Sequence, residues 1–234
     1  MPPRLFVLHA DAAVRASAMA AHPGAVLCRD WAELAARLST AAPTAQALVD
    51  PCPGEASVLA PELGELLRAL PSVSVTAALQ MEPARLAHVR TLQAWGICEV
   101  AALPAEASAQ ALQHILARAR GRAFLRAVKA VLPPHLSGNS TAVVIFAAQA
   151  AHAGGGAGAL ARTLGQRREM LTRTCADEGL PAPARLMAWM RALVMAQLLD
   201  DPARTAAGVA RACGYGGVAP LSDAFARVLQ GAEP

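Results

Sequence analysis

The apolar positions of the chain follow two different rhythms. In the first 120 residues, short apolar runs alternate with stretches in which apolar residues recur at helical spacing. The runs are Arg4 to Leu8, Ala25 to Cys28, Gln46 to Asp50, Ser72 to Leu79 and Cys98 to Leu103; the helical stretches lie near Ala12 to Ala21, Trp31 to Leu38, Leu59 to Leu70, Pro83 to Trp95 and Ala105 to Arg120. Because alternating strands and helices build a parallel sheet covered on both faces, this part predicts a flavodoxin-like, five-stranded α/β domain.

The second rhythm is purely helical. After an apolar helix from Thr141 to Ala151, two helix pairs follow, Leu160 to Gly179 and Thr205 to Gly231, each with a glycine in its tight turn. One long apolar helix, Ala182 to Leu199, joins them, and its residues at helical spacing predict a core stripe of Leu186, Trp189, Met190, Leu193 and Gln197. This part predicts an all-α domain with two helix-turn-helix units, an arrangement that presents a helix to the DNA major groove.

Domain boundaries follow from the same patterns. The α/β part is expected to cover residues 1–122 and the helical part residues 141–234. Between them, residues 123–140 are predicted to form a linker, since Pro133 to Ser140 is rich in proline, glycine and serine.

The helical part resembles the DNA-binding domain of the AraC/XylS family of bacterial transcription regulators. The residues that carry the resemblance agree with the family in order and spacing over about seventy positions. They are Leu160, Ala161, Leu164, Gly165, Leu171, Arg173 and Gly179 in the first unit, and Val209, Ala210, Cys213, Gly214, Tyr215, Ser222 and Phe225 in the second. The resemblance implies two helix-turn-helix units bridged by a linker helix, with double-stranded DNA as the partner.

The resemblance, with side-chain chemistry, suggests which residues would contact DNA. The first recognition helix should run from Arg167 to Asp177, with Met170, Leu171 and Cys175 in the core. The second should run from Val218 to Leu229, but it carries Ala219, Pro220, Asp223 and Ala226 where polar or basic residues are usual, so we expect it to support the first. The expected contacts are Arg162, Arg167, Arg168, Thr172 and Arg173, with Ser222 and Arg227 from the second unit.

Charge separates the two parts of the chain. Residues 1–106 hold seven arginines against ten acidic residues, a net charge of −3, whereas residues 107–234 hold fourteen basic against seven acidic residues, a net charge of +7. No acidic residue lies between Ala107 and Arg168, a stretch that contains Arg118, Arg120, Arg122, Arg126, Lys129, Arg162, Arg167 and Arg168. Beside a helix-turn-helix, such a stretch favours a phosphate-contacting surface over a merely solvated helix face.

The α/β part is similar to the receiver domain of response regulators. Asp50 ends the third strand with Pro53 and Gly54 beyond it; the other matching signals are Thr76 and Ala77 at the end of the fourth strand, Ala94-Trp95-Gly96, and Leu103-Pro104. In that family an acidic pair binds magnesium and a lysine contacts the phosphoryl group.

This chain departs from the receiver pattern at the residues of phosphoryl chemistry. The acidic pair is replaced by His9 and Ala10, the lysine position is Leu103, and the one lysine of the whole chain is Lys129. We therefore expect a pseudo-receiver, a platform for homodimerisation or partner contact, in which Asp50 caps the following turn. Phosphorylation of Asp50 stays open as the alternative.

Other chemistry finds little support in the sequence. Five cysteines and six histidines are scattered singly, so we expect no metal, no cofactor and no enzymatic activity. Without a bilayer-spanning apolar run or a signal peptide, a cytoplasmic protein with no membrane partner is expected. The sequence thus predicts a sequence-specific DNA-binding transcription regulator independent of phosphorylation. The competing interpretation is a protein-interaction module that keeps the AraC-like fold and has lost or weakened DNA binding.

Overall fold

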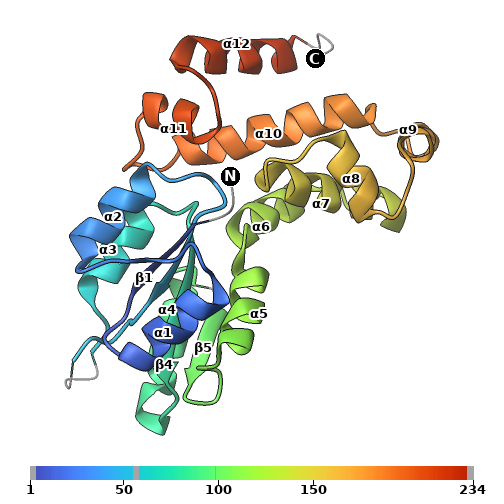
Figure 1. Ribbon diagram of the computed structural model, residues 1–234. Helices are drawn as coiled ribbons and strands as arrows, with labels where there is room; N and C mark the ends of the chain where they lie inside the picture. The colour runs from blue at the N-terminus through green and yellow to red at the C-terminus, as the bar shows by residue number, and fades with distance from the viewer. Residues whose placement is uncertain (1–3, 55–57, 98, 231–234) are drawn as a thin grey trace. The chain divides into compact units, whose positions relative to one another are not determined.

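The computed structural model describes residues 4–54, 58–97 and 99–230, and the chain in it divides into two compact units (Figure 1). One unit comprises Met1–Ala123 together with Asp201–Arg204, and the other comprises Phe124–Asp200 and Thr205–Pro234. Cys98 and Gly231, at the ends of two predicted elements, lie outside the described residues. No described helix has the length and apolar character needed to cross a bilayer.

The first unit is a five-stranded parallel sheet with the strand order β2-β1-β3-β4-β5. Its strands are β1 (Leu5–Leu8), β2 (Val26–Leu27), β3 (Gln46–Val49), β4 (Ser74–Gln80) and β5 (Glu99–Leu103). Its helices are α1 (Ala12–Ala21), α2 (Trp31–Ser39), α3 (Pro61–Ala69), η1 (Pro83–Arg85), α4 (Leu86–Ala94) and α5 (Ala109–Ala119). This strand order is that of doubly wound, flavodoxin-like folds and confirms the predicted parallel sheet.

Helices cover both faces of this sheet, and each face has its own core. Helices α2, α3 and α4 bury Leu34, Leu63 and Leu92 on one face, and α1 and α5 bury Val14 and Leu112 on the other. Phe6 belongs to the first core, whereas its strand neighbours Leu5 and Val7 belong to the second. Consecutive residues of β1 thus face opposite sides and are buried on both, which explains why the strand reads as a continuous apolar run.

Side-chain caps fix where several of these helices begin. Asp11 accepts a hydrogen bond from the backbone N–H of Ala13 and caps α1, and Asp30 caps α2 through the N–H of Glu33. Ser108 caps α5 in the same way. Asp11 therefore has a structural role one residue after the position where receivers carry their acidic pair.

The segment Asp201–Arg204 is part of the α/β unit through a network of buried polar contacts. The Asp201 carboxylate accepts hydrogen bonds from the backbone N–H and the hydroxyl of Ser72 and pairs with the Arg204 guanidinium at 2.9 Å. Arg204 also donates to the carbonyl oxygens of Ser39 and Ala41. Both charged side chains are almost fully buried, at 0% and 1% exposure.

The second unit is all-helical. It contains α6 (Arg122–Val131, from Phe124 onward), α7 (Gly138–His152), α8 (Ala157–Thr163), α9 (Arg168–Asp177), α10 (Pro183–Leu199), α11 (Ala206–Ala212) and α12 (Val218–Leu229). Helix α6 lies within the predicted linker 123–140. Its Phe124 and Val128 are buried in the core of this unit, and their spacing of four residues is that of an amphipathic helix.

Helix α10 separates two cores, which corrects the predicted stripe. Leu186 and Met190 are buried as expected, but Trp189 and Leu193 are 37% and 46% exposed. The buried positions follow two faces instead: Leu186, Met187, Met190, Val194 and Leu198 pack on α7, α8 and α9, and Ala192 and Met195 pack on α11 and α12. A helix with contacts on two sides buries residues outside a single 3.6-residue stripe.

Glu178 joins the end of α9 to the start of α7. Its carboxylate accepts hydrogen bonds from Ser137, the N-cap of α7, from Ser140 at 2.6 Å and from Asn139 at 2.8 Å. These donors, Ser137 foremost, lower the pKa of Glu178 to about 2. Because the pKa is lower in the folded protein, the ionised carboxylate stabilises the unit near neutral pH, and this stabilisation is lost as the pH falls toward 2.

We expect Glu178→Gln to lower the thermal midpoint of the helical unit at pH 7, and the difference from wild type to shrink progressively between pH 5 and pH 2. Melts followed by circular dichroism across this range measure the effect. Asp177→Asn is the control, since the side chain of the neighbouring Asp177 is exposed and has no hydrogen bond to the described residues. A midpoint difference independent of pH would contradict the role of the carboxylate.

Candidate functional site

Asp50 lies at the carboxyl edge of the parallel sheet, where doubly wound folds bind ligands. Its Oδ1 accepts a hydrogen bond from the backbone N–H of Cys52 at 3.0 Å, so that the carboxylate closes the turn after β3. Beside Asp50 is a hollow of about 230 Å³ lined by His9, Ala10, Asp11, Cys52, Gly54, Ala78, Leu79, Gln80, Arg85 and Leu103. These residues occupy the region where a receiver performs phosphoryl transfer.

The side chains around this hollow differ from those that phosphoryl transfer requires. The buried His9 ring accepts a hydrogen bond from the N–H of Asp11 at its Nδ1, and its Nε2 lies 3.2 Å from the carbonyl oxygen of Ala78. The lysine position after β5 is the apolar Leu103. Among the described residues, no group of three His, Cys, Asp or Glu side chains could hold a metal ion.

Thr76 lies inside β4 and not at its end, which corrects the sequence prediction. The strand continues to Gln80, and in the β3–β4 register Val49 lies opposite Ala77, so Ala78 lies nearest to Asp50 in this pairing. The Thr76 hydroxyl is buried and has no hydrogen-bond partner among the described residues.

Arg85 is a residue of this hollow that sequence reasoning missed. It belongs to η1, pairs with Glu82 at 4.0 Å, and supplies a positive charge beside Asp50 from the end of β4 and not from the end of β5. In the sequence it is one of several polar residues of a predicted helix. No local signal indicates that it faces the sheet edge.

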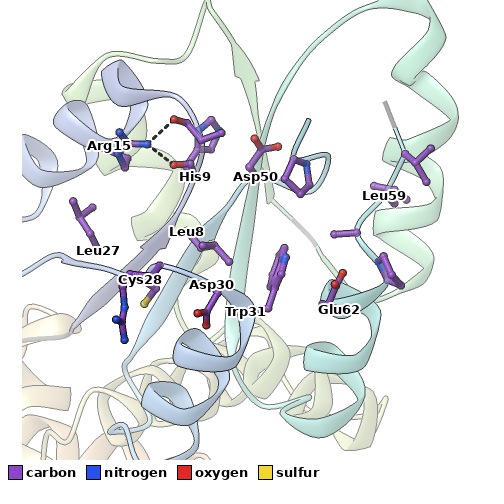
Figure 2. A pocket seen from close by; sticks show the side chains of 16 residues that line it. Leu8, His9, Arg15, Leu27, Cys28, Asp30, Trp31, Asp50, Leu59 and Glu62 are labelled. Carbon is purple, nitrogen blue, oxygen red and sulfur yellow. Dashed lines mark hydrogen bonds between the residues drawn. The ribbon is translucent and has the colours of Figure 1, made fainter. Parts of the chain in front are cut away.

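A larger cavity of about 780 Å³ opens on the β2 side of Asp50, at the carboxyl ends of β1, β2 and β3 (Figure 2). Trp31, Leu8 and Leu59 give it apolar walls, and the carboxylates of Asp30 and Glu62 line it with that of Asp50. Its volume is within the range of small-molecule sites. Arg15 lies at its edge and donates to the carbonyl oxygens of His9 and Ala10 at 2.8 and 2.5 Å.

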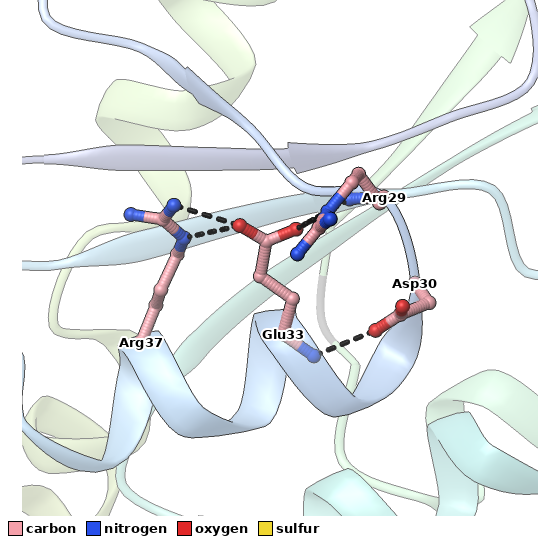
Figure 3. A network of polar contacts seen from close by, with 4 residues as sticks. All are labelled: Arg29, Asp30, Glu33 and Arg37. Atoms are coloured by element: carbon pink, nitrogen blue, oxygen red, sulfur yellow. Dashed lines mark hydrogen bonds and ion pairs between the residues drawn. The ribbon is translucent and has the colours of Figure 1, made fainter.

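An ionic network fixes the start of α2 beside this cavity (Figure 3). One oxygen of Glu33 accepts from the backbone N–H and the Nε of Arg29, and the other accepts from Nε and Nη2 of Arg37. The backbone hydrogen bond from Arg29 is the first cause that lowers the pKa of Glu33 to about 2, followed by the Arg37 and Arg29 side chains. The network and the Asp30 cap hold the turn of helix that carries Trp31.

In the helical unit, α9 exposes most of the predicted DNA contacts. Its buried side, Leu171 and Cys175, faces the core as expected, and Arg168, Thr172 and Arg173 are exposed. The N-cap residue Arg167 and, on α8, Arg162 are also exposed.

Two features of α9 were missed or wrong at the sequence level. Met170, predicted in the core, is 49% exposed, because it lies about 100° around the helix from Leu171. Glu169, in the first turn, adds a negative charge to the exposed face. The Arg168 guanidinium lies against Gly158 of α8, where a Cβ would come within 2.7 Å of its Nη2.

Helix α12 matches its predicted bounds and offers fewer polar groups. Ala219, Pro220, Ser222 and Asp223 are exposed, and Leu221 is buried. Arg227, a predicted DNA contact, has its Nε 3.4 Å from the carbonyl oxygen of Asp223 and lines a cavity between α12 and α10.

The basic stretch between Ala107 and Arg168 is divided between the two units. Arg118 and Arg122 both pair with the nearly buried Glu99 of the α/β unit, whose single carboxylate offsets part of their combined charge. Arg126 and Lys129 belong to the helical unit, where both are exposed on α6. Arg162, Arg167 and Arg168 complete the stretch on α8 and at the start of α9, where all three are exposed.

Comparisons with known proteins add one similarity. No protein-family model matches the chain, and neither does any curated protein. Among solved structures, full-length FixJ from B. japonicum is similar at a TM-score of 0.41 and 16% sequence identity, over 92% of this chain and 98% of that one. The flavodoxin-like fold of the first unit is shown by its own strand order.

Proposed function

We propose that this protein is a sequence-specific DNA-binding transcription regulator, with α8–α9 and α11–α12 as two AraC-type helix-turn-helix units. The observation that carries the proposal is the exposed face of α9. Arg167, Arg168 and Arg173 face solvent there with Thr172, on a helix anchored by buried Leu171. Arginine reads guanine with paired hydrogen bonds or binds phosphate, and threonine can contact either.

The turn that leads into α9 supports this arrangement. Gly165 has a φ of +64°, in the left-handed region that favours glycine, and lets α8 end sharply so that α9 can follow after four residues. Gly214 has a φ of +84° in the corresponding turn after α11. Two short helices joined by such a turn are the usual frame of a DNA-reading helix.

The two units are proposed to contribute unequally. Helix α9 would enter the major groove, and Arg162 would bind phosphate from α8. The exposed carboxylate of Asp223 on α12 would be repelled by the negatively charged phosphates of the DNA. This leaves Ser222 as the main DNA contact of the second unit.

The α/β unit is proposed to act without phosphorylation and to form a homodimer. Independence from phosphorylation is supported by the residues His9, Ala10 and Leu103, which stand where receivers have the acidic pair and the lysine. A dimer would pair two half-sites spaced by one turn of DNA or a multiple of it.

The test is a titration with DNA selected from a random pool, repeated at several salt concentrations. We expect the logarithm of the affinity to fall linearly with the logarithm of the salt concentration, by about 0.9 for each phosphate contacted, because binding releases counterions. Treatment with acetyl phosphate and Mg²⁺ should leave the affinity unchanged. An affinity that does not vary with salt would refute DNA binding.

A protein-interaction module is the second candidate function, and the surface of α12 favours it. Val218 and Leu229, the first and last residues of α12, are 46% and 83% exposed, and the small residues Ala219 and Pro220 beside Val218 are also exposed. If the protein enriches no sequence from the random DNA pool, this alternative is supported.

A further inference from the structure

A cavity of about 190 Å³ lies within the helical unit, between α10 and α12. It is lined by Arg185, Ala188, Trp189, Arg191 and Met195 of α10, by Tyr215, and by Ala224, Arg227 and Val228 of α12. The cavity is smaller than the roughly 300–1,000 Å³ of sites for whole organic ligands, and it suits a small group.

The charges that line this cavity are all positive. Arg185, Arg191 and Arg227 come from two helices, and no acidic side chain is among the lining residues. The bonds described for Arg191 and Arg227 go to carbonyl oxygens: Nη2 of Arg191 donates to Gly155 at 2.9 Å, and Nε of Arg227 to Asp223 at 3.4 Å. Carbonyl oxygens carry no formal charge, so the lining of the cavity contains three arginines and no anionic side chain.

Arg185 shows the clearest need for an acceptor. Its guanidinium lies over the Trp189 ring, 5.3 Å from the ring centroid, which holds the planar group in place. Its Nε is buried and has no hydrogen-bond partner among the described residues. A buried N–H without an acceptor is costly, and a shift of the Arg185 guanidinium toward the cavity would let an anion there supply one.

We propose that this cavity binds a phosphate group. Inorganic phosphate and phosphate monoesters carry more charge and more acceptor oxygens than a carboxylate, and guanidinium groups bind these and backbone phosphodiesters through paired hydrogen bonds. The group can come from the DNA backbone or from a free phosphorylated molecule. Since α10 and α12 supply the ligands together, binding would join the second helix pair to α10.

The site is tested without DNA, on the full chain in which Trp31 and Trp95 are changed to Phe, so that Trp189 is the one remaining tryptophan. Inorganic phosphate is titrated against sodium chloride at matched ionic strength, with Trp189 fluorescence as the readout. We expect a saturable change with phosphate alone. Arg185→Gln should raise the dissociation constant by about tenfold or more, as expected for loss of hydrogen bonds between charged groups.

The matched control is Arg211→Gln, an exposed arginine of α11 outside the cavity, which should leave phosphate binding unchanged. Circular dichroism checks folding, and Arg191→Gln replaces Arg185→Gln if the latter does not fold. The absence of a saturable response, or equal dissociation constants for the cavity variant and the control, would overturn the proposal.

A second arm identifies the source of the phosphate. If it is the DNA backbone, DNA and phosphate compete, and Arg185→Gln reduces the salt slope of DNA binding by about one. If it is a free molecule, phosphate binds equally to the DNA complex. Because the phosphate titration needs no DNA, this site and the proposed function can fail separately.

Discussion

Replacing Arg173 with alanine is expected to weaken binding to selected DNA by about tenfold or more, because a paired hydrogen bond to guanine contributes about 1–3 kcal/mol of discrimination. Arg173 is exposed on α9, on the side opposite the buried Leu171 and Cys175. The loss of the Arg173 side chain should also relax the base preference at one position of the selected DNA sequence. Arg168→Ala should weaken binding similarly but uniformly across sequences, as expected for a phosphate contact. Fluorescence anisotropy with matched and single-mismatch duplexes measures both effects.

Two comparisons make this result decisive. Ser222→Ala on α12 should change the affinity by less than about threefold, since one hydrogen bond contributes only about 1 kcal/mol. Arg90→Ala, an exposed arginine of α4 in the α/β unit, removes the same charge and should leave the affinity unchanged. If Ser222→Ala and Arg173→Ala had equal effects, the ranking of α9 above α12 would be wrong.

The sequence predicted the elements best where the environment of a residue depends on its own strand or on the adjacent turn. The strands buried on both faces read as apolar runs, so β1, β3 and β4 were predicted within two residues of their observed bounds. Helix α1 agrees with its predicted range because Asp11 provides a recognisable N-cap. Side chains that bond to the nearest turn are visible in sequence, and the Asp50 turn is one of them.

Features that depend on distant contacts could not be predicted. Trp189 and Leu193 have the composition of a core stripe, but α10 packs on two sides and leaves them exposed. Thr76 was placed at a strand end by the resemblance to receivers, although the apolar run itself reaches Leu79 and β4 continues to Gln80. The cavity between α10 and α12 combines side chains from two helices, and no spacing within either helix indicates it.

Replacing Asp201 with alanine is expected to lower the free energy of unfolding of the α/β unit by about 3–5 kcal/mol, because it leaves the Arg204 guanidinium buried without its anion. The exposed fractions of the two side chains are 0% and 1%, so water cannot take the place of the lost partner. The N–H and hydroxyl of Ser72 lose their acceptor at the same time. Urea unfolding of the Trp189→Phe chain, followed by Trp31 and Trp95 fluorescence, reports on this unit.

The neighbouring Asp200 provides the matched control. It is exposed, and the described residues give its side chain no hydrogen bond, so Asp200→Ala should change the unfolding free energy by less than about 0.5 kcal/mol. The double variant Asp201→Leu with Arg204→Met should recover much of the loss, because an apolar pair of similar volume removes the buried charge together with its partner. If Asp201→Ala were no more destabilising than Asp200→Ala, the buried pair would not contribute to the stability of the α/β unit.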